Sequence, residues 1–359
     1  MERVGRLKIG RVPIFVCILI PPLKVRGGNG ELLQTIALSL CCTVALTLTS
    51  PPEALGAPFG EGELITELGV ISSSLRGHTT YHISYYEGSS GIESELEFPL
   101  KTYLIGLDGA ISYKENSYEK LRLGFRVMKN IDNGSGRLKD SDWLSDDLDI
   151  SLYGVAHPGK DIYSESDIKL DALIIDLNMS YSLFSSKHLS FKPSIGYKHQ
   201  GFRFVVSNVS QTGYGPYSSD FTVYVPGEAL HYRIRYEFIY GGLDTEFLIG
   251  KDLRFLLKGG AGYVYAKDRD DHILRYKLAT ASADGAGGFL SICGDYNIFK
   301  GLHLKVGGEY LRFHTRGTQH QYFYRPNPDC PTGSCDAYIS DRIDSEQWNI
   351  SLILSYEFE

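Results

Sequence analysis

A two-residue alternation of apolar and polar side chains recurs along most of the chain, and it constrains the fold more than any other feature. In the last segment, the even-numbered residues from Trp348 to Phe358 are all apolar or aromatic. Because successive side chains of a strand point to opposite faces of a sheet, a period of two indicates a strand with one apolar face. About ten segments carry the pattern: Leu64–Ser73, Tyr103–Tyr113, Leu121–Val127, Leu173–Tyr181, Leu189–Tyr197, Tyr232–Tyr240, Leu253–Tyr263, Leu290–Ile298, Leu302–Tyr310 and Trp348–Phe358. The pattern predicts an all-β protein.

The connections favour a transmembrane barrel over a soluble β-sandwich, although both folds produce the same alternation. Short turns are expected near 114–118, 184–187, 248–252 and 299–301, and long connections over 75–101, 130–167, 205–228, 267–285 and 315–345. Short and long connections alternate, as do the periplasmic turns and outer loops of outer-membrane barrels. We therefore predict an antiparallel transmembrane β-barrel of about ten strands, with long outer loops and short periplasmic turns, in the bacterial outer membrane.

The two faces of such strands have different surroundings. The band that faces lipid is expected to include Leu173, Leu177, Tyr236, Phe238, Leu352 and Leu354. The charges of the other face are expected to form an ion network that fills a narrow lumen: Arg122, Arg126, Arg233, Arg235, Glu237 and Arg254.

Composition excludes several other classes of protein. The chain lacks the repeated runs of about 20 apolar residues that a bundle of membrane helices needs. Its 25 Tyr and 17 Phe residues supply a core, which argues against a disordered chain. The net charge of −7 argues against nucleic acid as a partner. We expect a monomer with no metal ion or other cofactor.

Residues 1–57 are expected to be a leader, and residues 58–359 a single barrel domain. Thr35–Leu48 has the length of the apolar region of a signal peptide, and the small residues of Ala54–Ala57 suit signal peptidase. The alternative is a membrane anchor. Residues 1–30 are an unusually long lead, so we expect the true start codon to lie downstream of Met1.

Cys330 and Cys335 lie in a Pro- and Gly-rich segment of a chain that is expected to be exported. An oxidising compartment favours disulfides, so we predict a small loop disulfide between them. Cys293 then remains as a free thiol on the lumen side of its strand.

Two acidic motifs lie in expected outer loops, on one rim of the predicted barrel. They are Asp140-Ser-Asp142-Trp143 and Asp268-Arg-Asp270-Asp271-His272. In an extended segment, Asp140 and Asp142 share a face, as do Asp268, Asp270 and His272. An aspartate that orients an imidazole, with facing carboxylates that hold water, can do acid–base work. The alternatives are solvated acidic loops, or a calcium site formed by Asp140, Asp142, Asp146 and Asp147.

These motifs resemble those of the omptins, outer-membrane proteases built on ten-stranded barrels. Gly134–Trp143 is similar to the omptin segment in which a Gly-rich lead precedes Asp-x-Asp-Trp, and Asp268–His272 is similar to the omptin Asp-x-Asp-acidic-His element. Weaker similarity covers nearly the whole chain after the leader.

The resemblance implies an endopeptidase with a water nucleophile and an active site that faces outside. Asp270 and His272 match the family's dyad, and Asp140 and Asp142 match its facing pair. Asp268 matches an acid that helps to bind a basic side chain before the scissile bond. A second acid of the family is absent, because Arg76–Tyr81 contains neither Asp nor Glu. The resemblance also implies peptide or protein substrates and lipopolysaccharide as a lipid partner that activity could require.

The dyad carries an expectation about pH. Asp270 is expected to raise the pKa of His272 above its reference value of about 6.5, while the aspartates stay ionised over the same range. Asp140 and Asp142 are expected to lie in a solvated loop. The alternative function is a non-enzymatic outer-membrane barrel, an adhesin or narrow porin with acidic ligand-binding loops. A soluble periplasmic β protein is a third hypothesis.

Overall fold

The computed structural model describes residues 62–87, 90–115, 118–145, 160–214, 222–326 and 330–358. These residues are almost entirely strand. The strands are β1 (Gly62–Glu87), β2 (Ser90–Pro99), β3 (Thr102–Glu115), β4 (Tyr118–Asn130), β5 (Arg137–Ser145), β6 (Ile162–Tyr181), β7 (Phe184–Ser185), β8 (Leu189–Gly213), β9 (Thr222–Ile249), β10 (Leu253–His272), β11 (Lys277–Phe299), β12 (Leu302–Phe323) and β13 (Asp336–Phe358). The predicted leader lies outside the described residues and stays a prediction.

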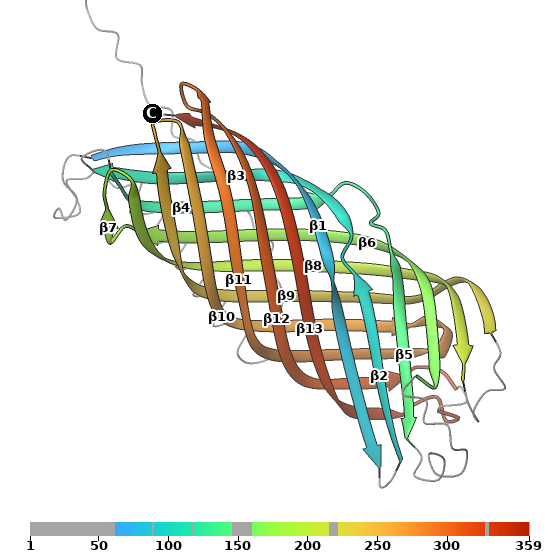
Figure 1. Cartoon of the computed structure of the whole chain (residues 1–359). Coiled ribbons are helices and arrows are strands. Elements are labelled where there is room, and N and C mark those ends of the chain that lie inside the picture. The colour runs from blue at the N-terminus through green and yellow to red at the C-terminus, as the bar shows by residue number, and fades with distance from the viewer. Residues whose placement is uncertain are drawn as a thin grey trace, which may run out of the picture. The chain divides into compact units, whose positions relative to one another are not determined.

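Antiparallel pairing closes the described strands into a ring (Figure 1). From β8 onward each long strand pairs with the next, and β13 pairs with β1, which closes the barrel. β2 and β3 both pair with β1, so together they occupy one strand position of the ring. β4 and β5 both pair with β6 and occupy another. Counted in this way, the described residues form a barrel with ten strand positions. A closed ring leaves no unpaired edge for lipid, which a spanning sheet requires. The predicted barrel is confirmed.

The predicted long connections lie at one end of the barrel, but most of their residues continue as paired strand and do not form irregular loops. β1 runs to Glu87 and β2 begins at Ser90, while β10 runs to His272 and β11 begins at Lys277. We call this the loop end of the barrel, and Figure 1 shows the strands extending toward it. At the other end, the turn end, tight turns at Ile249–Leu253 and Phe299–Leu302 match the prediction. The candidate site residues therefore lie on paired strands.

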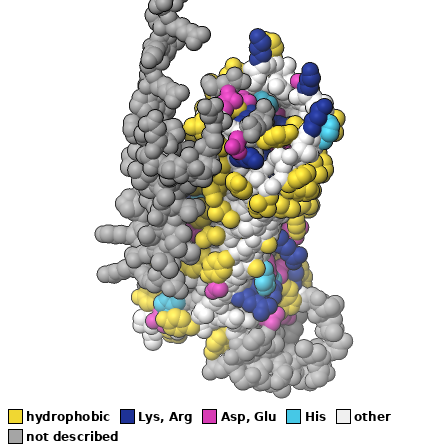
Figure 2. Space-filling model, turned by 90° about the vertical axis from the view of Figure 1, so that its left-hand side faces the viewer, with side chains coloured by type: hydrophobic (Ala, Val, Ile, Leu, Met, Phe, Trp, Pro, Cys, Tyr) yellow, Lys and Arg dark blue, Asp and Glu magenta, His cyan; other side chains and the backbone are white. Residues whose placement is uncertain are grey.

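A belt of exposed apolar side chains surrounds the barrel toward its turn end. Leu352 and Leu354 are each 51% exposed, as lipid-facing residues should be. Leu173 and Leu177 are half-buried on the outward face of β6, where they alternate with buried Ala172 and Ile174. Figure 2 shows the apolar side chains over the middle of one face, with charged side chains toward the two ends. Together these features match the outer surface of a transmembrane barrel.

Tyr236 and Phe238 were wrongly predicted to face lipid. Both side chains are fully buried inside the barrel, where each ring lies 5.1 Å from that of Phe313. The reason is that the apolar residues of β9 change from one face of the strand to the other along its length. Toward the turn end its apolar residues face outward, as exposed Leu243 does, whereas beyond the belt its apolar residues face inward. Alternation alone cannot reveal on which side of the wall a given apolar row lies.

The lumen of the membrane-spanning part is filled by ion pairs, as predicted for three of the six charges. Arg122 pairs with Glu67 at 3.0 Å, Arg126 with Asp108 at 2.8 Å and Arg254 with Asp295 at 2.6 Å. The prediction is wrong for Arg233, Arg235 and Glu237, which occupy the outward positions of β9 because its even-numbered residues are the buried ones. Among the described residues, no helix is long and apolar enough to cross a membrane.

An arginine in the middle of the apolar belt is expected to destabilise the barrel. Leu352→Arg should lower the free energy of unfolding by about 2–4 kcal/mol, because the guanidinium must leave water at the bilayer midplane. The control is Val223→Arg near the loop end of β9, where the exposed side chain lies far from the belt. Urea unfolding in lipid vesicles measures both variants. Equal stability of the two variants would contradict the position assigned to the belt.

Candidate active site

Asp270 and His272 form a close pair at the loop end of β10. Their side chains point inward, in line with buried Asp268. The Nε2 atom of His272 lies 2.7 Å from Oδ2 of Asp270. Tyr81 of β1 donates its phenolic hydrogen bond to the same Asp270 oxygen, and Asp270 is fully buried. The carboxylate is thus held between a phenol and an imidazole, which fixes the orientation of the ring.

Asp140 and Asp142 lie in β5, between β2 and β6, and not in a solvated loop. The Oγ atom of Ser164 donates to Oδ2 of Asp140 at 3.5 Å, and the Ser94 side chain hydrogen-bonds to Asp142. The expectation of a loop failed because the polar-rich segment 137–145 still pairs on both sides. Both carboxylates are held by neighbouring strands, so their positions are as fixed as those of the β10 residues.

The two pairs act on each other electrostatically through the barrel interior. Burial raises the pKa of Asp140 to about 8, and the charges of Asp142 and then Asp270 add to the rise. Burial also raises the pKa of Asp142, while the hydrogen bond from Ser94 opposes the rise. Near neutral pH the Asp140–Asp142 pair therefore keeps one proton, contrary to the expectation that all the aspartates stay ionised.

The pKa of His272 is lowered, and the prediction of a raised value is wrong. Burial disfavours the imidazolium and is the largest cause, and it outweighs the stabilising charge of Asp270. Lys277 opposes the imidazolium as well; it lies directly across from His272 on β11 and is buried. The neighbouring carboxylate alone would raise this pKa, and the burial that reverses its effect is not visible in the sequence. Since the imidazole is neutral above a pKa lower than 6.5, it can accept a proton over a wider pH range.

Two buried carboxylate oxygens at this site make no hydrogen bond within the residues that the structure describes. Oδ1 of Asp140 and Oδ1 of Asp270 have no hydrogen-bond partner within the described part of the chain. Most buried polar atoms of native proteins are paired, and exceptions often mark functional sites. Each of these two oxygens can still accept a hydrogen bond.

Asp268 lies deeper on β10 and is also held firmly. Its Oδ1 atom accepts a hydrogen bond from the backbone N–H of Ala281 at 2.7 Å, and its Oδ2 atom accepts one from the Tyr232 hydroxyl at 3.2 Å. Burial, followed by the charge of Asp341, raises its pKa well above the usual range.

Sequence reasoning missed Tyr81, Tyr232, Lys277 and Asp341. One signal for Asp341 was present, since it alternates with inward Ile339 and Ile343 and is thus an acid in an otherwise apolar row. The prediction of a long connection over 315–345 hides this row, because alternation is meaningful only within a strand.

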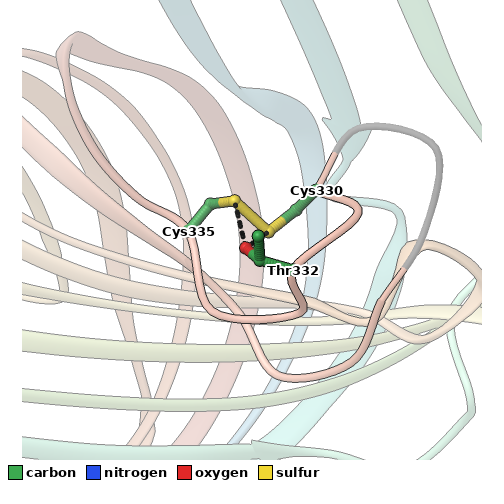
Figure 3. Close-up of a disulfide and its surroundings, with 3 residues drawn as sticks. All are labelled: Cys330, Thr332 and Cys335. Atoms are coloured by element: carbon green, nitrogen blue, oxygen red, sulfur yellow. Dashed lines mark hydrogen bonds between the residues drawn. A yellow bond between two sulfur atoms is a disulfide. The ribbon is translucent and has the colours of Figure 1, made fainter.

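The predicted disulfide between Cys330 and Cys335 is present in the connection between β12 and β13 (Figure 3). Thr332 lies beside both sulfur atoms. Cys293 is free and lines the lumen, as expected from its place on β11. Across the described ranges, no group of three or more His, Cys, Asp and Glu side chains could hold a metal ion. Asp146 and Asp147, invoked for the calcium alternative, lie outside those ranges.

Comparison with known proteins gives concordant results. The model of the omptin family matches residues 68–322. The plasminogen activator of Yersinia pestis is 25% identical over 197 residues, which are 54% of this chain and 59% of that protein. The match thus spans somewhat more than half of that relative's length. The crystal structure of the outer membrane protease OmpT from Escherichia coli superposes with a TM-score of 0.65 at 15% identity, covering 82% of this chain and 97% of that one, which shows a shared fold.

Proposed function

This chain belongs to the omptin family of the bacterial outer membrane, and from that premise we propose that it is an endopeptidase that hydrolyses peptide bonds with an activated water molecule. The observation that carries the proposal is the contact of 2.7 Å between His272 and Asp270 inside the barrel, and the charge of Asp270 also acts on Asp140. The active site is proposed to face the cell exterior. The names of the two similar proteins, a plasminogen activator and an outer membrane protease, support the proposal.

His272 is the proposed general base. A neutral imidazole takes a proton from water as the water attacks the peptide carbonyl, and the resulting imidazolium is stabilised by the ionised Asp270. The pKa of Asp270 is lowered even though burial opposes this, because His272 and the Tyr81 hydroxyl both favour its charged form. Tyr81 is a positioning residue in this scheme, since its hydrogen bond fixes the carboxylate that orients the ring.

The Asp140–Asp142 pair has two proposed tasks, one for each protonation state that it contains. Its ionised member accepts a hydrogen bond from the attacking water. Its protonated member donates a hydrogen bond to the carbonyl oxygen as negative charge develops there. A carboxylic acid that stays neutral at pH 7 can act as such a donor, and preorganised donors are a large source of transition-state stabilisation.

The alternative of a narrow porin fits the interior poorly. Ion pairs occupy the lumen in the membrane, and a cluster of aromatic rings lies above them, with Phe98 and Tyr232 stacked at 4.3 Å. A barrel filled in this way leaves little room for an aqueous channel.

A cleavage assay tests the proposal. Refolded protein is incubated with a peptide library in the presence and absence of lipopolysaccharide, and the fragments are identified by mass spectrometry. We expect internal cleavage by a monomeric barrel, with activity that depends on the lipid. Intact peptides under both conditions would contradict the proposal, and conductance across a bilayer would then favour the porin.

The rate is expected to follow a bell-shaped pH profile. It should rise as His272 loses its proton, with a midpoint below 6.5, and fall as the Asp140–Asp142 pair loses its shared proton near pH 8. Initial rates of kcat/KM between pH 4 and 10 measure both limbs. A rate that increases steadily through pH 9 would contradict the donor role of the pair.

A further inference from the structure

Lys277 is a buried cation to which the proposed mechanism gives no task. It begins β11 and is 6% exposed, on an inward row that continues with Ala279, Ala281 and Ala283. Lysine is seldom buried unless charges of opposite sign lie near it, because its ammonium loses the hydration that stabilises it in water. A single cation at the head of a row of alanines therefore indicates that this position serves the charges around it.

The strand pairing places Lys277 beside the proposed general base. Lys277 lies directly opposite His272 in the antiparallel ladder between β10 and β11, and both belong to the inward rows of their strands. Directly opposite residues of such a ladder have Cβ atoms about 4.5–5.5 Å apart. On its other side Lys277 is paired with Phe323 of β12, which is apolar. The register therefore fixes this cation next to the imidazole.

The charge of Lys277 reaches all four residues of the proposed catalytic unit. Burial is the largest cause of the lowered pKa of His272, Asp270 opposes it, and Lys277 reinforces it. At Asp270, Asp140 and Asp142, burial is again the largest influence on the pKa, and there Lys277 opposes it by favouring the ionised carboxylate. One ammonium thus biases the base toward its neutral form and the acids toward their charged forms.

Arg275, in the short 3₁₀ turn Ile273–Arg275, is a second cation near the dyad. It acts on His272 less than Lys277 does, although it acts more on Asp140 and Asp142. Its side chain is exposed, so water and salt screen its charge. The remaining titratable groups near the Asp270–His272 pair are Asp268 on β10, Tyr81 on β1, and Asp140 and Asp142 on β5, and on β9 the residue paired with His272 is the apolar Leu230. Within the described residues, Lys277 is therefore the buried cation of this site.

We propose that Lys277 is a positioning residue that acts through His272: its ammonium keeps the imidazole neutral, and thus able to accept a proton, at mildly acidic pH. The inference rests on the proposed peptidase function and deepens it, because it assigns the pH range of the site to a residue of the neighbouring strand. The same charge makes the imidazolium formed during turnover a stronger acid. The proton taken from water then passes more readily to the leaving amine.

The pH profile of kcat/KM tests the proposal in Lys277→Met, which keeps an unbranched apolar stem and removes the charge. The acid limb should move upward by about one pH unit, as expected for one charge a few ångströms away at the border of protein and water. The alkaline limb should move in the same direction, because the Asp140–Asp142 pair then holds its proton more firmly. A merely structural defect would lower the rate at every pH and leave both limbs in place.

Two further variants separate charge from shape. Lys277→Arg keeps the charge and should keep the wild-type profile. The control is Lys267→Met, which removes an exposed lysine from the outward face of β10 and should move neither limb. Heat-modifiable gel mobility verifies that each barrel is folded, and Lys277→Gln takes the place of Lys277→Met if the latter does not fold. Limbs that stay in place in the neutral variant, or that move as far in Lys277→Arg, would overturn the proposal.

Failure of the proposed function is distinguishable from failure of this inference. If the wild type cleaves no peptide, the peptidase function fails, and an NMR titration of labelled histidine in the refolded barrel decides the role of Lys277. The signal of His272 is assigned by its absence from the spectrum of His272→Ala. Its titration midpoint should lie higher in Lys277→Met than in the wild type, and an equal midpoint would overturn the proposal.

Discussion

His272→Ala is expected to lower kcat for peptide hydrolysis by about two to four orders of magnitude, the usual contribution of a positioned general base. The imidazole is a base that is neutral near pH 7, and it lies 2.7 Å from the buried, ionised carboxylate of Asp270. Steady-state rates at saturating peptide measure the loss. The barrel should fold normally, because the ring lies at the loop end and outside the membrane-spanning belt.

A histidine on the outward face supplies the control for this variant. The side chain of His231 on β9 is 40% exposed and pairs with Glu228, and its neighbour Leu230 is the residue paired with His272. His231→Ala should keep kcat within about threefold, since surface substitutions rarely disturb a site that they do not touch. A folded His272→Ala protein that cleaves at the wild-type rate would leave the adhesin as the better account.

Asp140→Ala is expected to lower kcat by about two to three orders of magnitude, the range observed when one donor to a developing oxyanion is removed. The variant loses the proton that the Asp140–Asp142 pair shares near neutral pH. Stability should be retained, because Oδ1 of the removed carboxylate is buried and has no hydrogen-bond partner among the described residues. Rates and heat-modifiable gel mobility are measured together.

Lys139→Ala is the matched control for Asp140→Ala, because Lys139 is adjacent on β5 but points outward to Glu97. It should cleave peptides like the wild type. An unfolded Asp140→Ala barrel, or a folded one with full activity, would contradict the role given to the pair.

The sequence predicted the ring of strands well because alternation follows directly from backbone geometry. The prediction of which side chains face lipid failed at the loop end, because the apolar face of the strands points into the barrel there, as Tyr236 and Phe238 show. The same alternation therefore marks inward residues at this end and lipid-facing residues in the belt. Within the second acidic motif, the shared inward face of Asp268, Asp270 and His272 could be predicted, because alternation along an extended segment determines which side chains share a face. Their electrostatics could not be predicted, because the burial that lowers the pKa of His272 and raises that of Asp140 depends on the surrounding strands.

The central claim is that the Asp270–His272 pair and the Asp140–Asp142 pair act as one catalytic unit, and a double-mutant cycle on kcat tests it most directly. Residues that act as a unit show strongly non-additive losses. His272→Ala combined with Asp140→Ala should therefore be no more than about threefold slower than His272→Ala alone. If the two losses instead multiply in full, the pairs contribute independently and the account of a shared water-activating site is contradicted.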